Sequence, residues 1–189
     1  MRFSIIIPAY NSEAYIRNAL NSIQAQTFTD YELIVVCDSC TDNTEEIAKE
    51  YGARTFTVNF HQDGQTRNVG IDNAQGELLL FMDDDDWWMH EHVLDDINKA
   101  FRHCDVLRFG FYWQMRGLCG PGDYYACWMK CYKRSFIGDD ARFSDIDKWS
   151  DVDFYNAVMW KHPRIRDLDE CLYYYNYLRE GSQSWEVES

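Results

Sequence analysis

An apolar run that changes at once into four carboxylates constrains this 189-residue chain more than any other stretch. The run covers Glu77 to Met82, and Asp83 to Asp86 follow it directly. A short continuous apolar run is typical of a strand that is buried on both faces of a mostly parallel sheet. Ligands of open α/β sheets bind at the carboxyl ends of the strands, so the four acids lie where a binding site is expected.

The four acids also need a partner. Two carboxylates about 5–6 Å apart repel each other by roughly 3 kcal/mol at an effective dielectric of about 20. Charge runs are usually solvated, so an acidic turn in water is the first alternative. The buried strand before Asp83 favours a cation instead. Mg²⁺ or Mn²⁺ suits oxygen ligands and also holds substrate phosphates.

The first 82 residues alternate between strand and helix patterns. Ser12 is expected to cap the first helix, and Asp42 with Glu45 is expected to form a capping box for the second. This alternation predicts a parallel, doubly wound sheet with right-handed crossovers. Predicted strands cover residues 3–8, 32–36, 54–58 and 77–82; predicted helices follow residue 12, run from 42 to 49 and cover 66–73.

The second half holds most of the tryptophans and tyrosines, which suits a wall that stacks on a base or a sugar. An ordinary aromatic core is the alternative. Asp151 lies near the start of a predicted helix, where the helix dipole favours a carboxylate. Predicted helices cover 90–101 and 150–160, predicted strands 105–113 and 168–175, a turn 116–123 and mixed structure 124–130.

Composition excludes several classes of protein. The net charge of −14 argues against a general binder of nucleic acid or anionic membranes. The glycine fingerprint of dinucleotide sites and the P-loop are both absent. No stretch is apolar enough to span a bilayer, and Met1 leads directly towards a strand, so no signal peptide is expected. Seven scattered cysteines indicate reduced thiols and a cytoplasmic location.

Several segments along the chain occur together in a recognisable order. In the first half these are Phe3 to Asn11, Val35 to Asp42, Arg67 to Glu77 and Phe81 to Trp87; in the second half, residues 128–136, 142–143 and 150–154. Together they resemble a family 2 glycosyltransferase with the GT-A fold. The resemblance implies one α/β domain over residues 1–189, with a mostly parallel central sheet flanked by helices. Residues 1–88 would bind the nucleotide sugar and residues 89–189 would form a small acceptor-side half.

The resemblance also implies an activity. It is the metal-dependent, inverting transfer of a hexose or N-acetylhexosamine from a nucleotide-diphosphate sugar, with UDP favoured over GDP, to a hydroxyl of a glycan or lipid-linked acceptor. The chemistry is consistent: a metal neutralises the charge that grows on a diphosphate leaving group. A positioned carboxylate takes the proton of the attacking hydroxyl. We also allow for peripheral membrane association and for a homodimer.

The resemblance assigns the donor-binding roles as follows. Pro8, Ala9 and Tyr10 line the base pocket, where Tyr10 stacks on uracil or a similar base. Asp38 hydrogen-bonds the edge of that base.

The remaining roles concern the phosphates and the reaction. Asp83 and Asp84 lie near the ribose and the donor phosphates. Asp85, together with Asp83, holds Mn²⁺ or Mg²⁺. Asp151 is the general base, and two arginines, Arg67 and Arg179, contact the diphosphate.

Departures from the family pattern keep other functions open. Cys37-Asp38-Ser39-Cys40 stands where the family has Asp-Asp-Gly-Ser, and Ser150-Asp151 stands where it has Glu-Asp. The chain is also short for the family, so a catalytically silent or partner-dependent nucleotide-sugar binder is the main alternative. A remote alternative is a thiol redox protein that uses Cys37 and Cys40.

Two metal sites other than the acidic run are also considered. Cys119, Cys127 and Cys131 could hold zinc, although their spacing matches no common finger. His90 and His92 flank the acids and could reach a metal, but a histidine at a helix start is more often a capping or surface residue.

Overall fold

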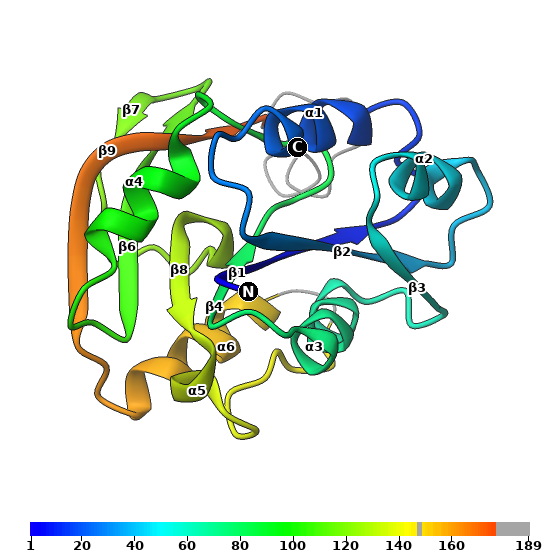
Figure 1. Ribbon diagram of the computed structural model, residues 1–189. Coiled ribbons are helices and arrows are strands. Elements are labelled where there is room, and N and C mark those ends of the chain that lie inside the picture. The colour runs from blue at the N-terminus through cyan, green and yellow to red at the C-terminus, as the bar shows by residue number, and fades with distance from the viewer. Residues whose placement is uncertain (147–148, 177–189) are drawn as a thin grey trace.

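A nine-stranded sheet with helices on both faces forms the centre of the computed structural model, which describes residues 1–146 and 149–176 (Figure 1). The strands are β1 (Phe3–Ala9), β2 (Tyr31–Asp38), β3 (Arg54–Val58), β4 (Leu78–Phe81), β5 (Trp87–Trp88), β6 (Val106–Trp113), β7 (Gly117–Cys119), β8 (Lys130–Lys133) and β9 (Ile165–Tyr175). The helices are α1 (Ile16–Gln24), α2 (Thr44–Glu50), α3 (Asp63–Asn73), α4 (Val93–Ala100), α5 (Arg134–Ile137) and α6 (Ser150–Trp160), and a 3-10 turn, η1, covers Cys127–Met129.

The parallel part of the sheet confirms the predicted α/β arrangement. Strands β3, β2, β1 and β4 lie side by side in that order, and each neighbouring pair is parallel. Helices α1, α2 and α3 make the connections that parallel strands require. Beyond β4 the order continues β8-β6-β9-β5, with β7 beside β6, and β8 is antiparallel to both of its neighbours. The complete sheet is therefore mixed.

Alternate residues of β1 face two separate apolar clusters. Ile5 and Ile7 belong to the cluster that includes residues of α1, α2 and α4. Ile6 belongs to the cluster that includes residues of α3, α5 and α6. Figure 1 shows α1 and α2 on one side of the β1–β2 part of the sheet and α3 on the other. Each fully buried isoleucine contributes about 1.5–3 kcal/mol, so both faces stabilise the strand that carries Tyr10 at its end.

The predicted caps of the first two helices are wrong. The Ser12 hydroxyl donates to the Tyr10 carbonyl and to Asp84, and α1 begins only at Ile16. Asp42 does accept the Thr44 N–H at 3.0 Å, but Glu45 does not complete a capping box. Its carboxylate instead forms an ion pair with Lys49 at 2.7 Å and accepts hydrogen bonds from two threonines of β3. In both places a contact distant in sequence competes with the local cap.

Some short elements are not predicted by the sequence pattern. These are β5 at the end of the first half, and β7, β8 and α5 in the second half. Strand β7 lies inside the predicted turn, β9 begins three residues before its predicted start, and α6 agrees with its predicted range. Within the described ranges, no helix is both long and apolar enough to cross a bilayer.

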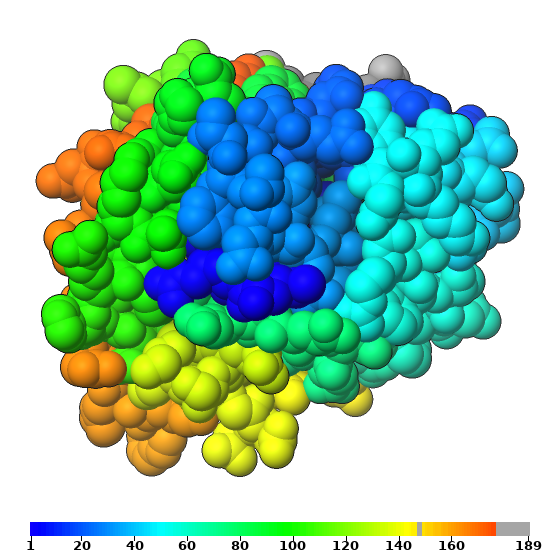
Figure 2. All heavy atoms as spheres, in the orientation of Figure 1, coloured from blue at the N-terminus to red at the C-terminus, as the bar shows by residue number. Residues whose placement is uncertain are grey.

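The start of the chain lies between segments from both halves. Arg2 accepts the Leu78 N–H through its carbonyl at 2.9 Å, and Glu77 accepts the Arg134 N–H in the same way at 2.9 Å. Figure 2 shows this face, where the first residues, the segment before β4 and the start of α5 lie together. This junction contains Gly76, whose N–H donates to the Ser4 hydroxyl at 2.8 Å.

Gly76→Ala is expected to destabilise the protein by about 1–3 kcal/mol or more. An added Cβ would lie 2.5 Å from backbone atoms of Phe3 and Ser4, and backbone in a central strand has little room to move. Gly120→Ala is the matched control, because a Cβ there meets nothing within 4 Å. Urea unfolding of the two variants measures the difference, and equal stabilities would contradict this account of the junction.

Asp105 joins three strands at the amino end of β6. Its carboxylate accepts two hydrogen bonds from the Arg164 side chain, both 2.8 Å, and one from the Arg164 N–H. Its carbonyl accepts the Lys133 N–H at 2.9 Å. The hydrogen bonds from the Arg164 side chain lower the pKa of Asp105 to about 2, although its burial opposes this shift.

The Asp105 ion pair predicts a loss of stability in acid. Because the folded-state pKa lies below the ordinary value, the stabilisation is complete above about pH 4 and is lost as the pH falls to about 2. We expect Asp105→Asn to lower the free energy of unfolding near neutral pH and to have a much smaller effect near pH 2. Unfolding curves at the two pH values test this, and a pH-independent difference would rule it out.

Candidate active site

Polar residues at the ends of β1 and β4 meet as the sequence predicted. The Tyr10 N–H donates to the Asp84 carboxylate at 3.3 Å, and the Ser12 hydroxyl donates to the same oxygen. Pro8 and Ala9 are buried within β1, so of the three predicted base-pocket residues only Tyr10 has an exposed side chain. A ligand contact made by Pro8 or Ala9 stays a prediction.

An exposed aromatic ring marks the side of this site next to β3. Tyr10 is 55% exposed, and its ring meets His61 edge to face with 6.2 Å between the ring centroids. Ser39 ties the same loop in place, because its hydroxyl donates to the Asn59 side chain at 2.6 Å. Sequence reasoning missed His61 and Asn59, since they lie in a polar loop without any motif.

Asp38 is held by the protein itself. It is buried, and its carboxylate accepts the N–H groups of Phe60, His61 and Gln62 at 2.8–3.0 Å and the Thr66 hydroxyl at 3.0 Å. Burial alone would raise the pKa of Asp38, but these hydrogen bonds lower it. They also order the loop before α3, which begins three residues before its predicted start. A contact with a base edge stays a prediction and would have to share these oxygens.

Asp86 is structural rather than part of an open acidic surface. It is fully buried, and its carboxyl accepts the Tyr173 hydroxyl at 2.7 Å and the Asn176 N–H at 2.8 Å. Burial, followed by the charges of Asp83 and Asp85, raises the pKa of Asp86 well above its usual value. Asp86, the last acid of the run, therefore attaches the acidic segment to the end of β9. The sequence pattern does not reveal this role.

Asp83 suits a divalent cation that a substrate helps to bind, whereas Asp85 is buried and its role as a metal ligand stays a prediction. Asp83 is about one quarter exposed, and one of its oxygens accepts a hydrogen bond from Arg67 at 2.7 Å. Among the described residues, no three His, Cys, Asp or Glu side chains are grouped to hold a metal. Mg²⁺ and Mn²⁺ are commonly bound by one or two carboxylates together with substrate phosphates, and this donor set fits that pattern.

Asp151 occupies the first turn of α6, as predicted. Trp149 before it adopts the left-handed conformation, with φ of 77°, and α6 starts at Ser150. One oxygen of Asp151 accepts the Cys127 N–H at 3.4 Å. The other oxygen is buried and has no hydrogen-bond partner among the described residues. A carboxylate with a buried, unsatisfied oxygen is unusual in a folded protein, and a catalytic role is one explanation for it.

Arg67 is buried beside the acidic run. Its guanidinium is buried, donates to Asp83 at 2.7 Å and lies 5.7 Å from the centre of the Phe143 ring. Burial alone would lower the pKa of Arg67, but the groups around it raise it well above the ordinary value. Those groups are Cys127, Asp83, Asp151 and Asp63. The structure thus brings together three predicted site residues that lie far apart in the sequence.

The aromatic residues of the second half divide into core and surface. Trp128 is buried and stacks on Tyr173 and Tyr175, with 4.6 and 5.0 Å between ring centroids. Trp149 and Tyr125 are 69% and 50% exposed, and Tyr125 packs against Tyr155 of α6. The core alternative therefore holds for the first group, while the second leaves rings exposed around the helix that carries Asp151.

A buried lysine supports the segment beside η1. The ammonium group of Lys130 donates to the carbonyls of Tyr124 and Ala126 at 2.6 and 2.7 Å. Burial lowers the pKa of Lys130 to about 8. Sequence reasoning missed this residue, because a lysine in a strand pattern gives no sign that it is fully buried.

The other proposed metal ligands are not brought together. Cys127 and Cys131 are buried and Cys119 is half-buried, and no metal cluster forms around them in the described part of the chain. His92 contacts Thr27 and Asp95 lies next to it, whereas His90 accepts the His92 N–H at 3.2 Å. Arg179 falls outside the described residues.

All seven cysteines are free thiols, as predicted. Cys37 and Cys40 lie in contact, and a hydrogen bond with Cys37 lowers the pKa of Cys40 to about 7. Cys37 is completely buried, which leaves Cys40 as the accessible thiol of the pair. Its sulfur donates to the Ala9 carbonyl at 3.4 Å and so holds the β1 end against the following turn.

Comparison with known proteins identifies relatives over nearly the whole chain. A family model described as "Glycosyl transferase family 2" matches residues 4–116. The poly(ribitol-phosphate) beta-N-acetylglucosaminyltransferase TarS of Staphylococcus aureus is 31% identical over 96% of this chain and 36% of its own length. The glycosyltransferase GlyA of Streptococcus pneumoniae is 34% identical over 97% of this chain and 31% of its own length. The chain thus spans about a third of these relatives.

Solved structures agree with the sequence matches. The structure of S. aureus TarS residues 1–349 with UDP has a TM-score of 0.82 and 28% identity, covering 93% of this chain and 60% of that chain. The structure of the same fragment with UDP-GlcNAc has a TM-score of 0.79 and 29% identity, covering 98% and 61%. A mannosyltransferase from Pyrobaculum calidifontis shares the fold, with a TM-score of 0.79 at 16% identity over 98% of this chain and 60% of that chain.

Proposed function

The chain belongs to glycosyl transferase family 2 and has the GT-A fold, and from that premise we propose that it transfers a sugar from a UDP-sugar to a hydroxyl group. The acceptor we propose is a glycan or a lipid-linked saccharide, and the anomeric centre is inverted. The observation that carries the proposal is the position of Arg67, which is buried and donates to Asp83 of the acidic run.

The donor site we propose begins at Tyr10. Its exposed ring and the neighbouring His61 offer a surface on which a base can stack. Asp84 accepts a hydrogen bond from the Tyr10 N–H, which supports its proposed role beside the ribose of a base bound there. The relatives TarS and its UDP-GlcNAc complex favour a UDP-sugar as the donor.

Asp151 acts as the general base in this proposal. The carboxylate accepts the proton of the attacking hydroxyl, and the Cys127 N–H holds one of its oxygens in place. With one base and in-line attack, inversion follows. The exposed rings of Trp149 and Tyr125 offer an apolar surface for the acceptor sugar.

Asp83 and Asp85 would hold Mn²⁺ or Mg²⁺ against the donor diphosphate. When bound, the cation neutralises the charge that develops on the leaving group. Arg67 keeps Asp83 oriented and adds a second positive charge to the same region. We also propose that the reaction occurs in the cytoplasm, in keeping with the seven free thiols, and that peripheral membrane contact and a homodimer remain compatible with it.

A thermal-shift panel of UDP, GDP, CDP and dTDP tests the donor assignment, each with Mn²⁺ and with EDTA. A ligand at one hundred times its dissociation constant stabilises the native state by about 2.7 kcal/mol, which is easily measured. We expect UDP with Mn²⁺ to raise the melting temperature and EDTA to remove most of that rise. If none of the four nucleotides stabilises the chain, its donor site is defective or incomplete, and the partner-dependent alternative replaces the proposal.

A further inference from the structure

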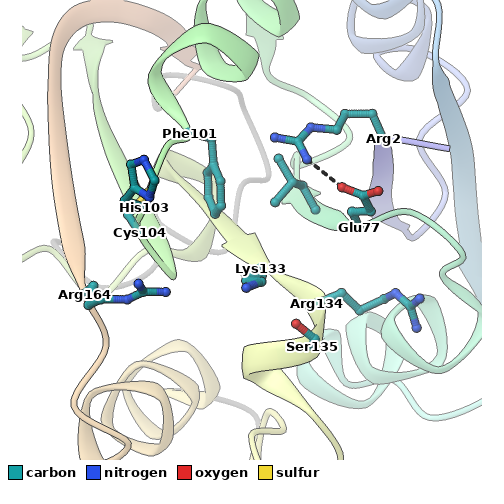
Figure 3. Close-up of a pocket in the computed structure, with 10 residues that line it drawn as sticks. Arg2, Glu77, Phe101, His103, Cys104, Lys133, Arg134, Ser135 and Arg164 are labelled. Atoms are coloured by element: carbon teal, nitrogen blue, oxygen red, sulfur yellow. Dashed lines mark hydrogen bonds and ion pairs between the residues drawn. The ribbon is translucent and has the colours of Figure 1, made fainter.

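A second hollow lies at the opposite end of the sheet from the candidate active site. Its volume is about 520 Å³, and it lies at the amino ends of β1 and β4, beside the end of β8 and the start of β9 (Figure 3). Tyr10 and Asp83 follow the carboxyl ends of β1 and β4. The seven residues of β1 separate the two ends by roughly 20 Å, so the hollow is distinct from the donor site.

Positive charge gathers in this hollow although the chain carries a net charge of −14. Two of its cations form ion pairs with acids. Arg2 pairs with Glu77 at 2.6 Å, and Arg164 pairs with Asp105 at 2.8 Å. No carboxylate in residues 1–146 or 149–176 forms an ion pair with the other two cations, Lys133 and Arg134. The hollow therefore keeps an excess of positive charge.

Lys133 and Arg164 direct their charges to the same place. Figure 3 shows the Arg164 guanidinium reaching across the floor of the hollow towards Lys133, with His103 on the wall above. Arg164 donates to the Asp105 carboxylate through Nε and Nη2, and these two hydrogen bonds orient the guanidinium. Its Nη1 atom has no acceptor among the described residues. Arg134 turns away, since its Nε donates to the Gly76 carbonyl at 2.6 Å.

The hollow is larger than a phosphate group and has an apolar side. Phe101 and Leu78 contribute to its lining beside the cations, and the Ser135 hydroxyl adds a hydrogen-bonding group. Its volume falls within the range of small-molecule sites, about 300–1,000 Å³. A fixed guanidinium together with a lysine is the usual protein complement of a phosphate dianion.

We propose that this hollow binds a small soluble phosphomonoester of a sugar or polyol. Lys133, Arg164 and His103 hold the phosphate, and the carbon part lies against Phe101. This site is separate from the proposed donor site and does not depend on the proposed transfer reaction.

Calorimetric titration of the full chain with glucose 6-phosphate, inorganic phosphate and glucose tests the proposal. We expect glucose 6-phosphate to bind, inorganic phosphate to bind more weakly and glucose not to bind. Lys133→Gln should weaken glucose 6-phosphate binding by about tenfold or more, since it removes one charged contact. Lys99→Gln is the matched control, because Lys99 is an exposed lysine of α4 that pairs with Asp96 outside the hollow.

Several outcomes would overturn the proposal. These are no binding of glucose 6-phosphate at millimolar concentration, equal binding by Lys133→Gln, or inorganic phosphate binding as tightly as the ester. Binding to phosphatidylglycerol vesicles without binding to glucose 6-phosphate would point to a lipid headgroup and would also contradict a soluble ligand. The response to UDP and Mn²⁺ should be unchanged in Lys133→Gln, so failure of this site and failure of the donor site are distinguishable.

Arg164→Gln is a second variant for the same site. It should weaken glucose 6-phosphate binding as well, and its unfolding curve must be recorded in parallel because it also removes the ion pair with Asp105. If Arg164→Gln is folded and binds glucose 6-phosphate as tightly as the wild-type chain, the phosphate does not bind beside Arg164 and the assignment is wrong.

Discussion

Asp151→Asn is expected to bind the donor normally and to lose sugar transfer by a factor of about 10²–10⁴, the usual contribution of a general base. An amide has no basic oxygen that can take the proton of the attacking hydroxyl. It can still accept the Cys127 N–H, which Asp151 accepts at 3.4 Å, so the local fold should survive. If Asp151→Asn is folded and binds the donor but does not transfer the sugar, the role of Asp151 is chemical and not structural.

The matched control for this variant is Asp153→Asn. Asp153 lies in the same first turn of α6 and is exposed. Sugar transfer is measured as UDP release, with an acceptor glycan on which the wild-type chain is active. Donor binding is measured by thermal shift. Normal transfer by Asp151→Asn would remove the general-base assignment, and equal losses in both variants would indicate an effect of helix charge.

Asp85→Asn is expected to remove the Mn²⁺-dependent part of donor stabilisation, whereas Asp86→Asn should retain it. Asp86 is buried and accepts the Tyr173 hydroxyl and the Asn176 N–H, and asparagine keeps an oxygen that can accept such hydrogen bonds. Asp85 should hold the metal on the diphosphate, so its replacement should forfeit most of the roughly 2.7 kcal/mol expected at one hundred times the dissociation constant.

Thermal shifts of UDP with Mn²⁺ and with EDTA measure both variants side by side. Because the two acids are neighbours, the comparison corrects for any general effect of removing charge from the run. Full Mn²⁺ dependence in Asp85→Asn would move the metal site elsewhere. If only Asp86→Asn loses the Mn²⁺ dependence, UDP binding depends on the contact between Asp86 and β9 and not on Asp85 as a metal ligand.

The parallel half of the sheet could be predicted because its strands are continuous apolar runs. Ile5, Ile6 and Ile7 have to be buried together, which only a strand covered on both faces allows. The position of the acids after β4 then follows from chain order alone. The same logic places α6 and Asp151, whose range needed no tertiary information.

The missed features all depend on contacts between distant residues. The start of α3 is set by Asp38, which collects three N–H groups from residues 60–62. The insertion of β8 between β4 and β6 cannot be read from a four-residue pattern with a buried lysine in it. Local preference also favoured Ser12 as a helix cap, yet its hydroxyl donates a hydrogen bond to Asp84, which is distant in sequence.

The attachment of Asp86 to β9 has a consequence for the order of assembly during synthesis. The parallel strands β1, β2, β3 and β4 find one another within the first 82 residues, so they can pair before the second half of the chain has been made. The acidic segment cannot reach its final shape until Tyr173 and Asn176 have left the ribosome and closed over it. Until then the nascent chain carries its four acids on an unsupported loop, so donor affinity should appear only when the last strand is complete.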